Sequence, residues 1–221
     1  AYEIRPRDWS SDVCSSDLSS TTDMTRLPRS IATAFLLSSL AGLSHTSALV
    51  AQQAPGSAQR VTDFSAARAT KVYRTSLITA PPVIDGALDD AAWQTAPESG
   101  GFYQTDPQNG YPGTEDTRFK ILYDEDNLYV GVTAFQKDPI LINELKRDFA
   151  AGDGDQIVVF LDTFHDQRNG FAFSTNPGSA MLDQQIAEGV VNANWDGIFE
   201  VRSKVYDWGW SAEFAIPFKS L

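Results

Sequence analysis

Residues 117–135 read TRFKILYDEDNLYVGVTAF, and this stretch decides the fold. Thr117–Tyr123 alternates apolar and polar side chains, and Leu128–Phe135 is rich in β-branched, aromatic and small residues. Both features are typical of β-strands, and two such runs joined by a short polar turn predict a hairpin. The turn, Asp124–Asn127, is acidic. The stretch therefore predicts a β-hairpin with a charged tip.

Further short runs of strand type lie on both sides of this hairpin, separated by turn sequences such as Asn176-Pro177-Gly178 and Asp207-Trp208-Gly209. Leu88–Thr95 alone suggests a short helix, with Trp93 facing inward. The runs are Val72–Ile78, Pro82–Ile84, Gln156–Phe164, Gly170–Thr175, Ala180–Ala187, Ile198–Tyr206 and Trp210–Ile216. About eight strands with so little helix predict an all-β fold, an antiparallel β-sandwich of jelly-roll or immunoglobulin-like type.

Two more specific predictions concern the core. Gln156–Phe164 is almost continuously apolar, as expected for a strand buried on both faces. Trp93 and Trp210 lie in apolar patterns, so both are predicted to be core residues.

The N-terminal part divides into three segments before the sandwich. Residues 24–51 resemble a secretory signal peptide, because Met24 is followed by two arginines, a short apolar run and small residues suited to cleavage after Ala48 or Ala51. Residues 1–23 then precede the native start, and within them Arg7–Leu18 resembles translated sequencing-adapter sequence. Residues 52–70 are rich in Ala, Gln and Ser and predict a flexible spacer, with a short helix as the alternative. Residues 71–221 form the predicted sandwich.

The export signal predicts a location in the periplasm, at the outer membrane or outside the cell, with no membrane span once the signal is removed. The whole chain carries a net charge of −12, and residues 52–221 carry −11, from 24 acidic and 13 basic side chains. Such an acidic chain is a poor match for nucleic acid or an anionic membrane surface. A single cysteine excludes an internal disulfide.

The motifs of nucleotide-binding proteins, metalloproteases and serine hydrolases are missing from residues 52–221. An ordered set of short motifs instead resembles carbohydrate-binding module family 9, in the form that begins large exported bacterial proteins. The set includes Ile84-Asp85-Gly86, Trp93, Leu128-Tyr129-Val130, Arg147-Asp148, Phe160-Leu161-Asp162, Asn176-Pro177-Gly178, Trp195-Asp196, Glu213 and Ile216-Pro217-Phe218. The resemblance covers about residues 79–221 and implies a non-catalytic β-sandwich that binds oligo- or polysaccharides. It also implies further domains downstream of Leu221, so that the sandwich in this chain is C-terminally truncated.

Sugar binding needs an aromatic face and convergent polar groups. Trp195 and Trp208 lie in turn sequences and are the candidate platforms, with packing against the sandwich as the alternative for each. The candidate polar ligands are Arg147, Asp148, Asp155 and Asn176, and a surface ion pair is the alternative for the charged ones. The sugar-binding members carry a tryptophan near the position of Ala151 and a glutamate near that of Val158, so half of their expected clamp is missing here.

Characterised relatives carry structural calcium, which binds six to eight oxygens. Asp124 and Asp126 form one group of oxygens, and Asp162 and Asp166 form another. The alternative for the first pair is a solvated hairpin tip.

Three other functions stay open at this point. A glycoside hydrolase needs a pair of facing carboxylates. A chain with this many acidic residues always contains some candidate pair, so the sequence neither supports nor excludes this function. A haem-binding sandwich would use His165 and Met181 as iron ligands. A docking domain for an outer-membrane barrel would bind no small ligand.

Overall fold

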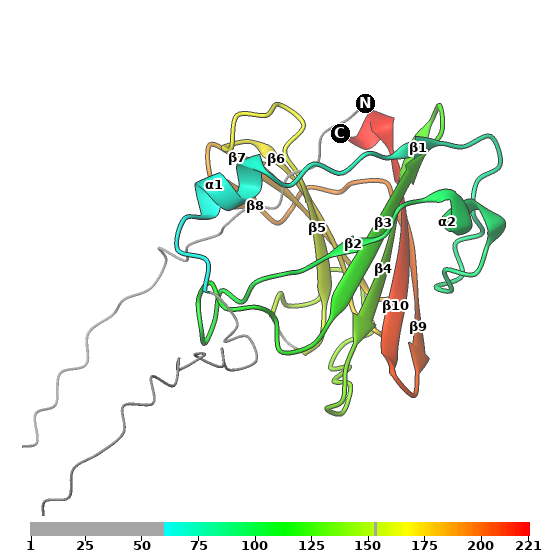
Figure 1. Ribbon diagram of the computed structural model, residues 1–221. Coiled ribbons are helices and arrows are strands. Elements are labelled where there is room, and N and C mark those ends of the chain that lie inside the picture. The colour runs from blue at the N-terminus through cyan, green and yellow to red at the C-terminus, as the bar shows by residue number, and fades with distance from the viewer. Residues whose placement is uncertain (1–59, 153) are drawn as a thin grey trace, which may run out of the picture. The chain divides into compact units, whose positions relative to one another are not determined.

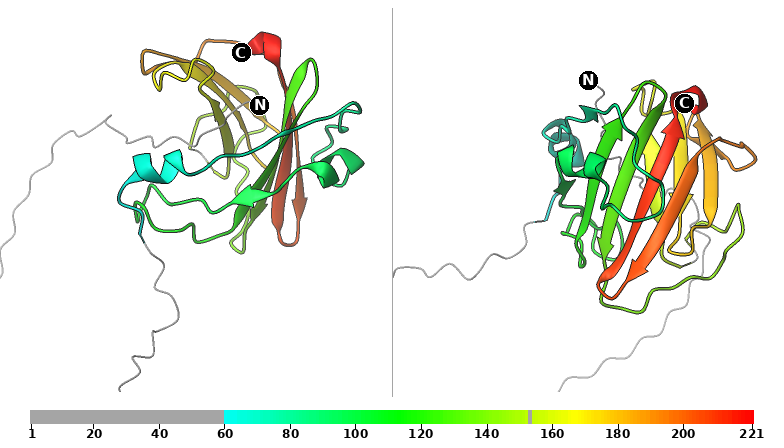
Figure 2. Two further views of the ribbon diagram at one scale, coloured as in Figure 1. Left: turned by 45° about the horizontal axis from the view of Figure 1, so that its top comes forward. Right: turned by 90° about the vertical axis from the view of Figure 1, so that its right-hand side faces the viewer.

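The computed structural model describes residues 60–152 and 154–221, which form two packed β-sheets (Figure 1). The six-stranded sheet has the order β1-β3-β4-β10-β9, with β2 also paired to β3, and the four-stranded sheet has the order β5-β6-β7-β8. In the right-hand view of Figure 2, the six-stranded sheet lies in front of the four-stranded sheet. The predicted all-β sandwich is therefore confirmed.

The elements of the six-stranded sheet are β1 (Ser76–Leu77), β2 (Ser99–Gly100), β3 (Thr117–Tyr123), β4 (Asn127–Phe135), β9 (Glu200–Tyr206) and β10 (Gly209–Pro217). Those of the four-stranded sheet are β5 (Ile157–Leu161), β6 (Gly170–Thr175), β7 (Met181–Ala187) and β8 (Val190–Asn192). The helical elements are α1 (Phe64–Ala69), α2 (Ala91–Thr95) and the 3₁₀ turn η1 (Phe218–Ser220). None of the helices between residues 60 and 221 is long and apolar enough to cross a membrane.

The predicted hairpin is present as β3 and β4, in antiparallel register with Tyr123 opposite Leu128. Asp124 stabilises its tip, because one oxygen of its carboxylate accepts hydrogen bonds from the backbone N–H groups of Asp126 (2.8 Å) and Asn127 (2.7 Å). Such side-chain bonds replace the ladder bonds that the turn lacks. The acidic tip thus has a local structural role.

The prediction that Gln156–Phe164 is buried on both faces is wrong. The strand that forms there, β5, lies at the edge of its sheet, and Val158 and Phe160 are 36% and 40% exposed. All six residues of β6 are buried instead, and β6 has a neighbouring strand on each side.

The N-terminal part of the domain also differs from expectation. Only Ser76–Leu77 of the predicted strand 72–78 forms a strand, and it pairs in parallel with β3, so the six-stranded sheet is not wholly antiparallel. Pro82–Ile84 forms no strand, whereas β2 and β8 were not predicted. The helix α1 lies within the predicted spacer, in agreement with the alternative for that segment. The predicted adapter segment 1–23 and signal peptide 24–51 lie outside the described residues.

The main core lies between the two sheets and confirms Trp210 as a core residue, 2% exposed. It packs the apolar faces of β4 and β10 against Phe171 and Phe173 of β6. Trp93 is fully buried in a second cluster with Leu122 and Tyr129, on the other face of the six-stranded sheet. This second cluster exists because α2 and the segment before it cover that face (Figure 1).

Glu213 of β10 joins this covering segment to the sheet, and its side chain is fully buried. One carboxylate oxygen accepts hydrogen bonds from the N–H groups of Asp85 (2.9 Å) and Gly86 (2.7 Å), and the other accepts one from the indole N–H of Trp93 (2.6 Å). Burial raises the pKa of Glu213, and the three hydrogen bonds oppose that shift. Three motifs that lie far apart in the sequence therefore meet in one buried network of hydrogen bonds.

Candidate functional site

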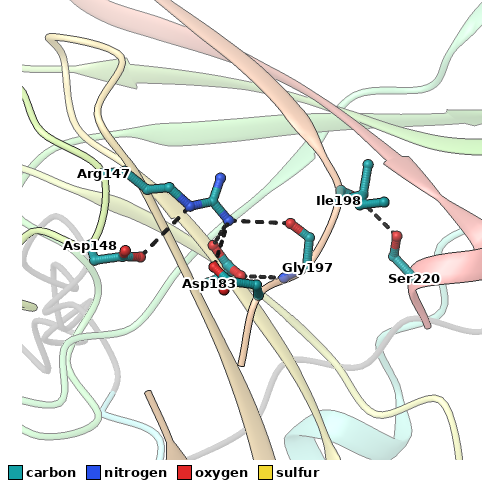
Figure 3. Close-up of polar contacts among 7 residues, drawn as sticks. Arg147, Asp148, Asp183, Gly197, Ile198 and Ser220 are labelled. Atoms are coloured by element: carbon teal, nitrogen blue, oxygen red, sulfur yellow. Dashed lines mark hydrogen bonds and ion pairs between the residues drawn. The ribbon is translucent and has the colours of Figure 1, made fainter. Parts of the chain in front are cut away.

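The candidate site is centred on Arg147, which lies in the connection between β4 and β5 (Figure 3). Its Nη2 atom donates hydrogen bonds to a carboxylate oxygen of Asp183 on β7 (2.5 Å) and to the carbonyl oxygen of Gly197 (3.3 Å). The carboxylate of Asp196 is 3.6 Å from the same nitrogen. Three segments of the chain thus converge on one guanidinium group, whose side chain is 40% exposed.

Asp183 forms the buried end of this cluster, with no exposed surface. Its second carboxylate oxygen accepts a hydrogen bond from the N–H of Gly197. Burial raises the pKa of Asp183, while the bond from Gly197 and the charge of Arg147 act in the opposite direction. A buried carboxylate without partners would be strongly destabilising, so these two contacts are required for its presence there.

Trp195 lies beside the cluster and is half-buried. Its ring centroid is 5.0 Å from that of Phe171 and 6.0 Å from that of Phe173. Both predicted roles are therefore compatible with its position, because the ring packs on the core and still leaves part of its surface exposed.

Asp148 joins the same cluster, whereas Asp155 does not. The carboxylate of Asp148 is 55% exposed and 3.9 Å from Nε of Arg147. One carboxylate oxygen of Asp155 accepts hydrogen bonds from the side chain of Gln136 (2.9 Å) and the N–H of Leu141 (2.7 Å). Asp155 therefore holds the β4–β5 connection in place.

Asn176 is 1% exposed and fully engaged with the backbone. Its amide donates to the carbonyl of Glu144 (2.6 Å), and its oxygen accepts from the N–H groups of Gly178 (3.0 Å) and Ala180 (3.1 Å). This pattern stabilises the turn between β6 and β7.

We expect Asn176→Ala to lower the free energy of unfolding by about 2–4 kcal/mol, because two N–H groups and one carbonyl lose their partner. Urea unfolding followed by circular dichroism measures this change. Asn194→Ala, at an exposed loop position, is the matched control and should change stability by less than about 0.5 kcal/mol. A stable Asn176→Ala variant that loses only ligand affinity would contradict the turn role.

Trp208 lies in an aromatic row rather than on a free surface. Gly209 pairs with Tyr206 of β9 and Phe135 of β4, which places these two residues roughly 10 Å apart across β10. The ring centroid of Trp208 is 4.6 Å from that of Tyr206, in a stacked arrangement, and 5.2 Å from that of Phe135. Its ring thus fits between the two others, and Trp208 is 40% exposed.

The four predicted calcium ligands all make hydrogen bonds within the protein. The carboxylate of Asp124 binds two backbone N–H groups and the Tyr129 hydroxyl, and that of Asp162 binds the N–H groups of Asp166 and Gln167. Asp166 in turn accepts from the backbone N–H groups of Arg168 and Asn169 and from the Asn169 side chain, whose bond lowers the pKa of Asp166. In the described part of the chain, no three His, Cys, Asp or Glu side chains come together as a metal site would require. The fourth residue, Asp126, contributes its backbone N–H to the hairpin tip.

The structure also contradicts the haem alternative. His165 is exposed in the loop after β5, whereas Met181 packs against the core at the start of β7. Because Met181 pairs with Thr175, and Thr175 with Ile157 at the start of β5, the two residues lie at opposite ends of the four-stranded sheet. They cannot bind one iron.

Sequence reasoning missed Asp183, the most deeply buried residue of the candidate site. The signal was present, because Asp183 occupies a position of β7 next to the apolar Leu182 and opposite Phe173 of β6. An acid inside a strand of a predicted sandwich needs a partner, but the sequence alone did not identify Arg147 as that partner.

Comparison with protein families gives a match over residues 84–221 to the family described as "Carbohydrate family 9 binding domain-like". The chain belongs to this family. Family 9 modules are non-catalytic and bind carbohydrate, so the predicted binding module is confirmed and the glycoside hydrolase alternative is not supported.

Solved structures with a similar fold include family 9 modules from Caldicellulosiruptor kristjanssonii. One, in complex with cellotriose, is 19% identical with a TM-score of 0.45, and 65% of this chain aligns with 65% of that chain. Another, in complex with glucose, is 18% identical with a TM-score of 0.44, over 65% of this chain and 68% of that chain. A candidate carbohydrate-binding protein from Bacteroides uniformis is 12% identical with a TM-score of 0.53, over 66% and 72% of the two chains. The chain thus spans just under two thirds of the first structure. The comparison with curated proteins found no match.

Proposed function

We propose that this family 9 module binds an uncharged oligosaccharide at the Arg147 cluster. The observation that carries the proposal is the position of a half-buried tryptophan beside a guanidinium group that still has donors to offer. Arg147 uses Nη2 for Asp183 and Gly197, and its side chain is 40% exposed. Nη1 and Nε can therefore donate to sugar hydroxyls, while the exposed part of Trp195 contacts the apolar face of a pyranose ring.

The charges around Arg147 favour an uncharged ligand. Three carboxylates, those of Asp148, Asp183 and Asp196, lie within 4 Å of this single guanidinium group. A uronic acid would meet an excess of negative charge here, whereas a neutral sugar can use the exposed carboxylates of Asp148 and Asp196 as hydrogen-bond acceptors.

We expect Trp195→Ala to weaken binding of cellotriose or xylotriose at least tenfold, because the ring supplies the apolar contact. Isothermal titration calorimetry of the full chain measures the affinity. Trp208→Ala is the matched control, since it removes a ring of the same size from outside the cluster. No heat with either sugar, or equal affinities for wild type and Trp195→Ala, would overturn the proposal.

The cellular context is a further part of the proposal. The signal-like segment 24–51 supports export, and the module then serves as the sugar-binding part of a larger exported protein that acts on polysaccharide. Expression of the chain from Met24 in a bacterial host tests export. We expect the periplasmic product to begin shortly after Ala48 or Ala51, as determined by N-terminal sequencing, and retention of an unprocessed chain in the cytoplasm would contradict it.

A further inference from the structure

We propose that Asp183 is a positioning residue, which holds Trp195 in the orientation that the ligand contacts. The inference rests on the proposed function, because the contact that it positions is the one assigned there. It concerns a residue that touches no ligand itself, since its side chain has no exposed surface.

Gly197 is held in place through both of its backbone polar groups. Its N–H donates to the carboxylate of Asp183, and its carbonyl oxygen accepts from Arg147, which in turn binds Asp183 (Figure 3). Both polar groups of Gly197 are thus tied to the same ion pair. A loop whose backbone is held on both sides by a buried charged group has little freedom to move.

Gly197 also lies in contact with the indole ring of Trp195. A Cβ atom placed on Gly197 would lie 2.5 Å from Cη2 and 2.7 Å from Cζ3 of Trp195, so the ring lies directly against this glycine. The same hypothetical atom would be 3.3 Å from Cε1 of Phe173. Trp195 therefore fits between Gly197 and the core, and a shift of Gly197 must change the position of the ring.

The two neighbouring acids cannot replace Asp183 as the residue that holds Gly197. Asp196 and Asp148 lie 3.6 and 3.9 Å from Arg147, and their side chains are 85% and 55% exposed. Contacts of this kind between solvated charges are weak. Asp183 alone combines burial, a 2.5 Å contact to Arg147 and a bond to the backbone of the loop.

The experiment compares Asp183→Asn with Asp196→Asn in the full chain labelled with 5-fluorotryptophan. The ¹⁹F resonance of Trp195 is assigned by its loss in Trp195→Phe. In the absence of sugar, we expect Asp183→Asn to shift or broaden the Trp195 resonance, while the resonances of Trp93 and Trp210 stay unchanged. Asp196→Asn should leave all three resonances unchanged. The affinity for cellotriose should fall about tenfold in Asp183→Asn, because the displaced indole ring no longer meets the sugar.

An unchanged Trp195 resonance in folded Asp183→Asn protein would overturn the inference. If Asp183→Asn does not fold, Arg147→Gln breaks the same ion pair from its exposed end, and an unchanged Trp195 resonance in that variant is equally contradictory. Because these spectra are recorded without ligand, they test the positioning role separately from sugar binding. Wild-type protein that binds no sugar would overturn the proposed function, whatever the spectra show.

Discussion

Glu213→Ala should lower the free energy of unfolding by about 3–5 kcal/mol, because a buried donor left without its acceptor costs about 1–3 kcal/mol and this substitution leaves three. The N–H groups of Asp85 and Gly86 and the indole N–H of Trp93 would all lose their acceptor in a buried environment. No water can easily replace the carboxylate, since Trp93 and Glu213 are both fully buried.

Urea unfolding followed by circular dichroism at 218 nm or so, a wavelength that reports on sheet structure, measures this loss. Glu200→Ala is the matched control, because Glu200 is exposed at the start of the neighbouring strand β9, opposite Ala215 of β10. We expect that control to change stability by less than about 0.5 kcal/mol. Similar midpoints for Glu213→Ala and Glu200→Ala would show that the buried network contributes little.

The pH dependence of stability should identify Glu213 as well. Burial raises the pKa of Glu213 above its ordinary value, so the folded protein holds this proton at pH values where the unfolded chain has lost it. The contribution of Glu213 to stability is therefore largest below the unfolded pKa and declines as the pH rises through the window up to the folded pKa. Glu213→Gln removes this titration, so the stability advantage of the wild type over Glu213→Gln should shrink as the pH rises above the ordinary pKa of a glutamate side chain, about 4.3. A constant difference between the two proteins would contradict the raised pKa.

Gly86→Ala should be the second large effect, with a loss of about 3 kcal/mol or more. Gly86 has φ +90°, a conformation that a side chain disfavours, and a Cβ atom there would lie 2.6 Å from the backbone carbon of Ser203 and 2.9 Å from the nitrogen of Lys204. The covering segment can approach the six-stranded sheet this closely only because residue 86 has no side chain. Displacement of the turn would also break the hydrogen bonds from Asp85 and Gly86 to Glu213.

The control for this substitution is Gly101→Ala. Gly101 has a similar backbone conformation, φ +74°, but nothing lies within 4 Å of the position that its Cβ would occupy. Its substitution should cost only about 1–2 kcal/mol from backbone strain, and thermal or urea unfolding of both variants separates the strain from the steric clash. Equal losses in the two variants would mean that the close approach to Ser203 has no energetic consequence.

The predictions for Glu213 and Gly86 concern motifs of the family resemblance, and they assign these particular motifs to the scaffold. Asp85-Gly86, Trp93 and Glu213 form the buried network on the outer face of the six-stranded sheet. The candidate ligand contacts lie elsewhere, around Arg147 and the four-stranded sheet. Arg147-Asp148 and Trp195-Asp196 belong to the same motif set, so one part of the set stabilises the scaffold and another part forms the proposed binding site.

Local sequence patterns were enough to predict the β3–β4 hairpin, most of the other strands, the two core tryptophans and the family. These features follow from local alternation, turn residues and an ordered set of motifs, all of which are properties of neighbouring residues. The sequence also indicated Arg147 and Trp195 as candidates. It could not separate them from Asn176 and Asp155, because a polar residue in a turn looks the same whether it binds a ligand or its own backbone.

Only the tertiary structure decided which polar groups meet. Asp183 was missed because its partner lies 36 residues away on the connection before β5, and no local pattern records such a contact. Trp208 was a candidate platform from its turn sequence, and its ring contacts with Tyr206 and Phe135 could not be predicted from that turn. Burial of β5 was overestimated because an apolar run does not show whether its strand lies at the centre or the edge of a sheet. In each case the outcome depends on strand order or on a contact with a distant segment, such as Arg147 with Asp183 or Phe135 with Trp208, and local sequence patterns do not record either.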